Sequence, residues 1–160
     1  MHHRAKALVA LLLGVSCSIH AAKLESLQQW IKKKPNYLLD KNNVAFMASR
    51  CSALYLVLNS RVEEASSSKE LQDTAKEYAN RALVFDQVRE VFSRVTDLMM
   101  QSSKAQQKEF GKIYADMSLN NWKQHNDIFR GIVNDDLDVC DDHYLHFKKL
   151  ANNLSKDIKK

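Results

Sequence analysis

The chain is almost free of the residues that interrupt helices and build tight turns. Among its 160 residues it has one proline, Pro35, and three glycines, Gly14, Gly111 and Gly131. Two-residue hairpin turns between strands favour Asn-Gly or Asp-Gly, and neither dipeptide occurs in the sequence. Because proline and glycine are the strongest helix breakers, the chain after Pro35 can run as long helices, and an all-β fold is disfavoured.

Apolar residues recur at every third or fourth position along most of the sequence, which is the period of an amphipathic helix. The periodic stretches are residues 40–65, 68–101, 108–132 and 133–158, with a shorter one at 24–34. Short connections between long helices favour antiparallel neighbours. The sequence therefore predicts an all-α fold, an antiparallel four-helix bundle with a short extra N-terminal helix, in a single domain over residues 22–160.

Local signals mark the expected ends of these helices. Asp40 is a suitable N-cap for the first long helix. Ser67 and Glu70 form the S-x-x-E pattern of a capping box before the second helix. The polar stretch QSSKAQQ, residues 101–107, is interpreted as a turn, because one helix continuing through it would be too long for the first helix to cover.

The first 21 residues have the layout of a secretory signal peptide. Arg4 and Lys6 precede an apolar run over residues 7–15, and small residues lead to Ala21, after which we expect cleavage. A membrane anchor is disfavoured because a spanning helix needs about 20 apolar residues. Cleavage would remove two basic residues and lower the formal net charge from +5 to +3. We therefore expect a periplasmic or secreted protein with no integral membrane span after cleavage.

Two cysteines remain after cleavage, Cys51 in the first long helix and Cys140 in the last. An even number of cysteines in an oxidising compartment predicts a disulfide, although both positions also suit buried free thiols. In a simple antiparallel bundle Cys140 would face the end of the first helix rather than Cys51 near its middle. The last helix must therefore slide about two turns along the first or cross it steeply.

Three histidines are candidate metal ligands. His143 and His146 lie three residues apart on a predicted helix, where two imidazoles can share one ion, and His125 is a further candidate. The sequence has neither C-x-x-C-H nor H-E-x-x-H. We expect no cofactor, and a metal- or haem-binding bundle is the alternative function. Nearby acidic residues are interpreted as the start of the last helix, whose free N–H groups they complement; they are Asp135, Asp136, Asp138, Asp141 and Asp142.

Enzymatic motifs do not occur in the sequence. We find no nucleophile elbow, Walker loop or Gly-rich dinucleotide turn. A thiol enzyme that uses Cys51 with His125 or His143 as base is a minor alternative. Nucleic-acid binding would need basic residues interleaved with stacking aromatics, whereas the aromatic residues here follow the core period. We therefore expect a non-enzymatic protein.

The expected role is that of a binding, assembly or stress accessory protein. Its partner would be another protein, the envelope itself or a second copy in a homodimer, with no role for nucleic acid. We expect the contact surface at Trp30, Ile31 and Tyr37, apolar residues of the N-terminal segment. In size and layout the chain resembles short helical envelope proteins with one early and one late cysteine, a likeness carried by RCSALY at 50–55 and DLDVC at 136–140. It implies no particular family or site residue.

Overall fold

The computed structural model describes residues 24–65, 68–94 and 97–157. Within these ranges the chain forms five α-helices and one short 3-10 helix, with no strand. Their bounds are α1 Leu27–Lys32, η1 Tyr37–Leu39, α2 Lys41–Ala65, α3 Lys69–Ser93, α4 Asp97–His125 and α5 Ile132–Asp157. The predicted all-α fold is confirmed. The predicted signal peptide, residues 1–21, lies outside the described residues.

The first two long helices begin close to the predicted positions. Asp40 caps α2, because its Oδ1 accepts the N–H groups of Asn42 at 2.8 Å and of Asn43 at 3.1 Å. The cap of α3 is Ser68, whose hydroxyl accepts the N–H of Leu71 at 3.4 Å. This cap lies one residue after the predicted one, Ser67, which is outside the described residues.

The boundary between the second and third long helices was predicted wrongly. Helix α3 ends at Ser93, and α4 continues through the polar stretch 101–107 that was interpreted as a turn. The hydroxyl of Ser93 donates to the carbonyl of Arg89 at 2.6 Å, a side-chain bond that competes with the helical ladder. The polar stretch is helical because some of its side chains have polar partners on α2 and α3, which are described below.

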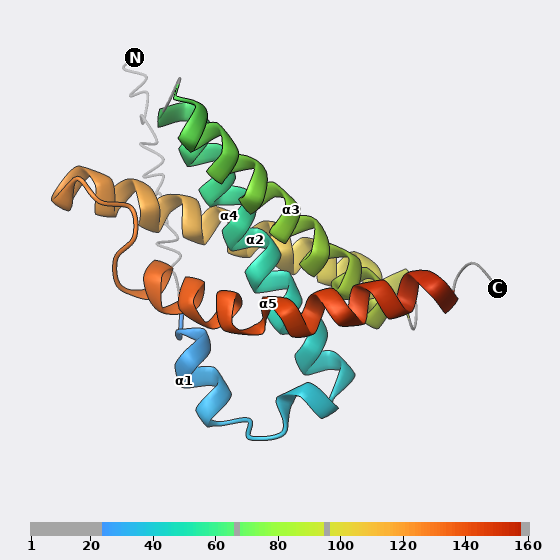
Figure 1. The fold of residues 1–160 in the computed structure, drawn as a ribbon. Coiled ribbons are helices and arrows are strands. Elements are labelled where there is room, and N and C mark those ends of the chain that lie inside the picture. Colours follow the sequence, from blue (N-terminus) through green and yellow to red (C-terminus); the bar gives the residue numbers. More distant parts are fainter. Residues whose placement is uncertain (1–23, 66–67, 95–96, 158–160) are drawn as a thin grey trace, which may run out of the picture.

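The helices pack around α2. Figure 1 shows α2 and α3 side by side and antiparallel, with α5 crossing in front of them at a steep angle and α4 behind. The core fills the space between these helices, and its largest fully buried apolar side chains are Leu27, Met47, Leu54, Tyr55, Leu58, Phe85, Val88, Tyr114, Val133 and Phe147. Among the described helices, none is long and apolar enough to span a bilayer.

The steep crossing of α5 brings the two predicted disulfide partners together. Cys51 and Cys140 are bonded, with their Cα atoms 5.6 Å apart and both residues fully buried. The prediction of this disulfide is confirmed, and the crossing removes the offset that a simple antiparallel arrangement would impose. The bond joins α2 to α5 across a sequence separation of 89 residues.

The connection from α4 to α5 uses two residues with left-handed backbone. Asn126 has φ 53° and follows α4, and its N–H donates to the carbonyl of Trp122 at 2.8 Å, which closes the helix end. Gly131 has φ 56° and precedes α5. This conformation is unfavourable for most side chains, whereas glycine and asparagine tolerate it, so both positions carry suitable residues.

Replacing Gly131 with alanine is expected to lower the free energy of unfolding by about 1 kcal/mol, because a β-carbon is strained at its φ of 56°. Gly111 provides the matched control. It lies inside α4, and an added β-carbon would meet no atom within 4 Å, so Gly111→Ala should raise the free energy of unfolding by about 0.5–1 kcal/mol. Chemical denaturation of the two variants measures both changes, and shifts of the same sign would contradict this account.

Candidate functional site

A buried ion pair lies at the centre of the molecule. Arg50 of α2 is 1% exposed, and its Nη2 contacts the carboxylate of Asp136, which is 0% exposed and belongs to α5. The same guanidinium donates to the hydroxyl of Tyr114 at 3.1 Å and to the carbonyl of Glu25 at 2.7 Å. It also lies over the ring of Phe110, 5.5 Å from its centroid. The pair therefore links α2, α4, α5 and the segment before α1.

The carboxylate of Asp136 has further partners. It accepts the hydroxyl of Tyr114 and the backbone N–H of Leu27, the latter at 2.5 Å. Burial raises the pKa of Asp136 above its ordinary value, and the positive charge of Arg50 opposes that rise. A buried charge with this many hydrogen bonds stabilises one arrangement of helices. Because it is sealed from solvent, we assign the cluster a structural role.

A second ion pair joins α3 to α5 nearer the surface. Arg81 Nη1 lies 2.5 Å from Asp141 Oδ1 and its Nη2 lies 2.5 Å from Glu77 Oε1. The hydroxyl of Tyr55 also donates to Asp141, and burial raises the pKa of this tyrosine. The interpretation of the acidic residues as a helix start fits only Asp135, which lies in the first turn of α5. It was wrong for Asp138 and Asp142, which lie beyond that turn, and for Asp136 and Asp141, whose carboxylates pair with arginines from other helices.

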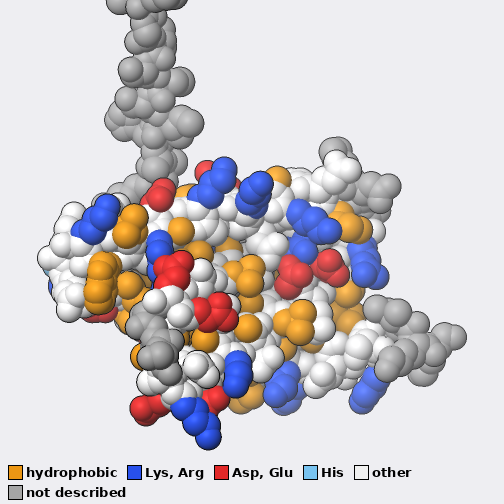
Figure 2. Space-filling view, turned by 90° about the horizontal axis from the view of Figure 1, so that it is seen from above, with side chains coloured by type: hydrophobic (Ala, Val, Ile, Leu, Met, Phe, Trp, Pro, Cys, Tyr) orange, Lys and Arg blue, Asp and Glu red, His pale blue; other side chains and the backbone are white. Residues whose placement is uncertain are grey.

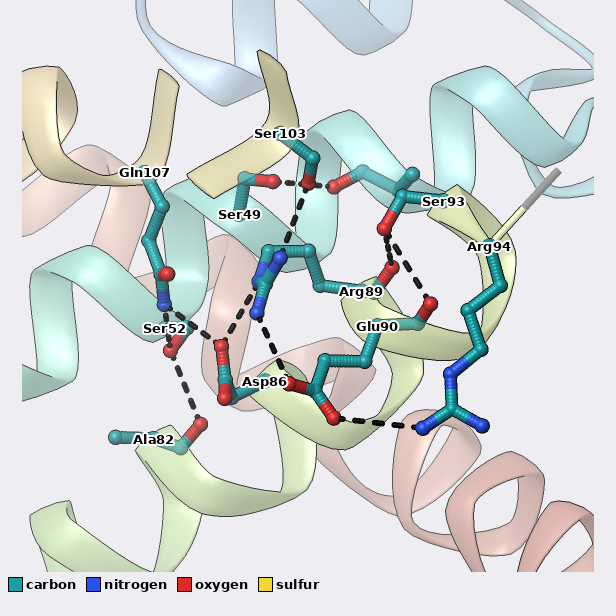
Figure 3. A network of polar contacts seen from close by, with 11 residues as sticks. Ser49, Ser52, Ala82, Asp86, Arg89, Glu90, Ser93, Arg94, Ser103 and Gln107 are labelled. Atoms are coloured by element: carbon teal, nitrogen blue, oxygen red, sulfur yellow. Dashed lines mark hydrogen bonds and ion pairs between the residues drawn. The ribbon is translucent and has the colours of Figure 1, made fainter. Parts of the chain in front are cut away.

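A third polar network explains why residues 101–107 are helical. Figure 3 shows Gln107 and Ser103 of α4 pointing toward polar side chains of α2 and α3. Gln107 Nε2 donates to Ser52 Oγ at 2.8 Å and to Asp86 Oδ1 at 3.0 Å. Arg89, which is 1% exposed, donates to Asp86 at 2.8 Å and to Ser103 at 3.3 Å. The inner face of this part of α4 is thus polar, and an apolar period does not reveal it.

The predicted metal ligands are not gathered at one place. The Nδ1 of His143 lies 2.8 Å from the carbonyl of Val139, so it carries the hydrogen, and Nε2 accepts the hydroxyl of Tyr37. His146 is exposed and packs edge-on against Phe147, and His125 is exposed at the end of α4. Over the part of the chain that the structure describes, no three His, Cys, Asp or Glu side chains form a group that could hold a metal ion.

The residues predicted as a contact surface lie at the N-terminal end of the fold. Trp30 is half-buried and stacks on Phe46 with centroids 4.8 Å apart. Ile31 is half-buried against the core, and Tyr37 is 8% exposed with its hydroxyl on His143. These contacts dock α1 and η1 on α2 and α5. The proposed contact role of these residues stays a prediction.

A more open apolar feature lies at the opposite end of α2. A cleft of about 500 Å³ opens between the C-terminal parts of α2 and α4, the start of α3 and residues 126–129. We call it the Trp122 cleft, and its apolar lining residues are Val62, Leu71, Leu119, Trp122, Ile128 and Phe129. Trp122 is 52% exposed, Leu71 39% and Leu119 37%. Large apolar side chains are therefore open to solvent on a concave surface.

The wall of this cleft formed by residues 126–129 is held in place by hydrogen bonds. Asp127 Oδ1 accepts the N–H of Phe129 at 2.8 Å. Asn121 Nδ2 donates to the carbonyls of Ile128 at 3.3 Å and of Arg130 at 3.0 Å. Because the wall is already ordered, an occupant of the cleft has little ordering cost to overcome.

Polar groups surround the apolar lining. Arg61 and Glu64 line it and form an ion pair of 2.9 Å, and Asp127 also lines it. Ser118, which is 0% exposed, also lines the cleft, and its Oγ is without a hydrogen-bond partner in the described ranges. An apolar centre with a polar rim is the composition of a protein interface. The cleft can therefore hold apolar side chains of a partner while polar groups fix their position.

Many exposed apolar side chains in the described ranges lie outside this cleft, among them Leu39, Leu83 and Leu145. Figure 2 shows hydrophobic side chains in the middle of one face, with acidic side chains among them and Lys and Arg side chains around the edge. Scattered apolar residues of this kind are normal on protein surfaces. The Trp122 cleft differs because six apolar side chains from four segments share one hollow.

The sequence analysis did not single out this cleft. Trp122 belongs to the periodic stretch 108–132, and the apolar residues of such a stretch are expected in the core. The available signal was the interruption of the apolar period at residues 118–121. Beyond this point the apolar side of α4 meets the cleft instead of the core. No protein-family model, curated protein or solved structure matches the chain.

Proposed function

We propose that this is an exported, non-enzymatic accessory protein that binds a partner protein through the Trp122 cleft. The observation that carries the proposal is the exposure of Trp122, at 52%, on the wall of an ordered apolar cleft. Tryptophan is enriched among the residues that dominate binding energy at interfaces. The expected ligand is an apolar or aromatic ridge on one face of a partner segment.

The shape of the cleft favours a protein segment over a lipid chain. Leu71, Leu119 and Trp122 remain partly exposed, so an occupant would be covered on one side only. A lipid chain is apolar all round and would leave its outer side in water, which is unfavourable. An amphipathic helix presents one apolar face and keeps its polar face in solvent.

Two further observations support the proposal. A buried disulfide, Cys51 to Cys140, is typical of an oxidising compartment, which agrees with the signal-like layout of residues 1–21. The same bond occupies the only thiol that we considered as a nucleophile. The ionisable groups of Arg50 and Asp136 are sealed in the core, where no substrate reaches them.

The proposal predicts where a partner can be cross-linked. A photo-cross-linking residue is introduced at position 119 or 122, and the protein is irradiated in the presence of envelope material. Either position should give one discrete adduct with a partner protein. The matched control is position 39. Leu39 is 85% exposed but lies just before the N-terminal end of α2, whereas the cleft lies at the C-terminal end of that helix. Equal adducts from position 39 would show that the cross-linking is not specific to the cleft.

The partner identified in this way allows a second measurement. Leu119→Asp should weaken its binding by about thirtyfold or more, as expected for a residue at the centre of an interface. Leu39→Asp should leave the affinity unchanged, and circular dichroism should show that both variants are folded. Unchanged affinity in Leu119→Asp would exclude the cleft as the binding site.

A further inference from the structure

A second groove runs along the seam between α2 and α4, beside the Trp122 cleft. It has a volume of about 490 Å³, and we call it the Lys104 groove. Small or aliphatic residues form its floor, namely Ala53, Leu56, Val57, Gly111 and Ala115. Leu56 is 50% exposed, and an added β-carbon at Gly111 would meet no atom within 4 Å. The groove therefore has an open hollow at Gly111.

The rim of this groove is positively charged. Lys104 and Lys108 line it from one side, both are exposed, and neither forms an ion pair with another described residue. The next lysine along α4, Lys112, differs from these two because it already pairs with Glu109 at 3.4 Å. The two groove lysines are thus free to meet carboxylates of a second molecule.

Helix α5 presents a matching ridge on its outer surface. Asp138, Asp142 and Leu145 are all exposed, and Leu145 is 69% exposed. Asp138 accepts a hydrogen bond from Asn134 at 3.2 Å, but neither it nor Asp142 forms an ion pair within the described part of the chain. The ridge therefore offers two carboxylates and one large apolar side chain.

The ridge and the groove have the same spacing. Lys104, Lys108 and Gly111 lie at positions i, i+4 and i+7 of α4, and Asp138, Asp142 and Leu145 lie at i, i+4 and i+7 of α5. Residues with this spacing share one face of a helix. If the two helices lie parallel, each aspartate meets one lysine and Leu145 meets the hollow at Gly111. One turn further, Lys149 comes level with Ala115, near Glu64 on the rim.

We propose that a second copy of this chain docks the Asp138, Asp142 and Leu145 ridge of its α5 in the Lys104 groove. The two surfaces differ, so the contact is heterologous and joins copies head to tail. The groove and the Trp122 cleft share Arg61 and Glu64 at their rims but no apolar residue, so the contact leaves the apolar lining of the cleft open to its own partner. Opposite charges at matched spacing determine the register, and Leu145 in the hollow at Gly111 removes an exposed apolar side chain from water.

Sedimentation analysis of charge-reversed variants tests the proposal. The wild-type protein should associate as its concentration rises, and added salt should weaken the association. Lys104→Glu with Lys108→Glu, or Asp138→Lys with Asp142→Lys, should each weaken it by about a hundredfold, because like charges then face each other. Mixing the two variants should restore association, because each groove again meets an oppositely charged ridge.

The matched control is Lys41→Glu with Lys123→Glu, which makes the same charge change at two exposed positions that do not line the groove. This variant should associate like the wild type. A wild-type protein that stays monomeric at all concentrations would overturn the proposal, and so would a mixture of the two reversed variants that fails to associate. Neither result would affect binding at the Trp122 cleft, which is measured with the cross-linked partner.

Discussion

Replacing Cys51 and Cys140 together with alanine is expected to lower the free energy of unfolding by about 4.6 kcal/mol. In the chain-entropy model a disulfide stabilises by restricting the unfolded chain, and the effect grows with the length of the closed loop. Here the bonded residues are 89 positions apart, which makes the loop long. The total stability of a domain of this size is about 5–15 kcal/mol, so the loss is a large part of it.

Chemical denaturation with and without reductant measures this contribution. The wild-type protein should shift to a lower midpoint when it is reduced, whereas the double variant should have the same midpoint in both conditions. If reduction left the wild-type midpoint unchanged, the two cysteines would not be bonded to each other in the folded protein.

Arg50→Met is expected to lower the free energy of unfolding by about 3–5 kcal/mol, the usual effect of removing one partner of a buried ion pair. The loss is large because Asp136 would keep its charge in the core without a counter-charge, and Tyr114 and Glu25 would lose a donor. A double variant, Arg50→Met with Asp136→Leu, removes both charges and should recover most of the loss. Thermal and chemical denaturation of the single and double variants provide the comparison.

The effect of Arg50→Met should also depend on pH. Burial already raises the pKa of Asp136 above its ordinary value of 3.8, and without Arg50 it rises further. A carboxyl with a higher pKa in the folded state binds more protons when folded, so stability falls as pH rises through this range. The variant should therefore be least destabilised in acid. If the loss of stability caused by Arg50→Met grew toward acid pH, it would not arise from the unpaired charge of Asp136.

The helical fold could be predicted from the sequence because it depends on local signals. Asp40 caps α2 where a cap was expected, and the apolar period places α2, α5 and the start of α3 nearly as found. The error at residues 94–107 has a physical cause, since Ser103 and Gln107 pack inward through hydrogen bonds rather than apolar contact. A hydrophobic pattern does not detect a polar inner face.

The pairing of charged residues could not be predicted in the same way. Arg50 lies next to Cys51 on α2, and Asp136 lies one turn before Cys140 on α5. The ion pair of Arg50 with Asp136 and the disulfide of Cys51 with Cys140 therefore stabilise the same crossing of α2 and α5. The disulfide followed from cysteine count and compartment, whereas pairing Arg50 with Asp136 requires the crossing angle. The Trp122 cleft was missed for a related reason, because it is formed by residues far apart in the sequence.

The contacts of Glu25 and Leu27 have a consequence for the order in which the chain folds. Their backbone groups bond to Arg50 and Asp136, and the bond between Leu27 and Asp136 spans 109 residues. The N-terminal segment therefore cannot complete its packing until α5 has been synthesised. Non-local contacts of this kind slow folding. We expect the helices to form early and the N-terminal segment to dock last, as α5 closes over α2.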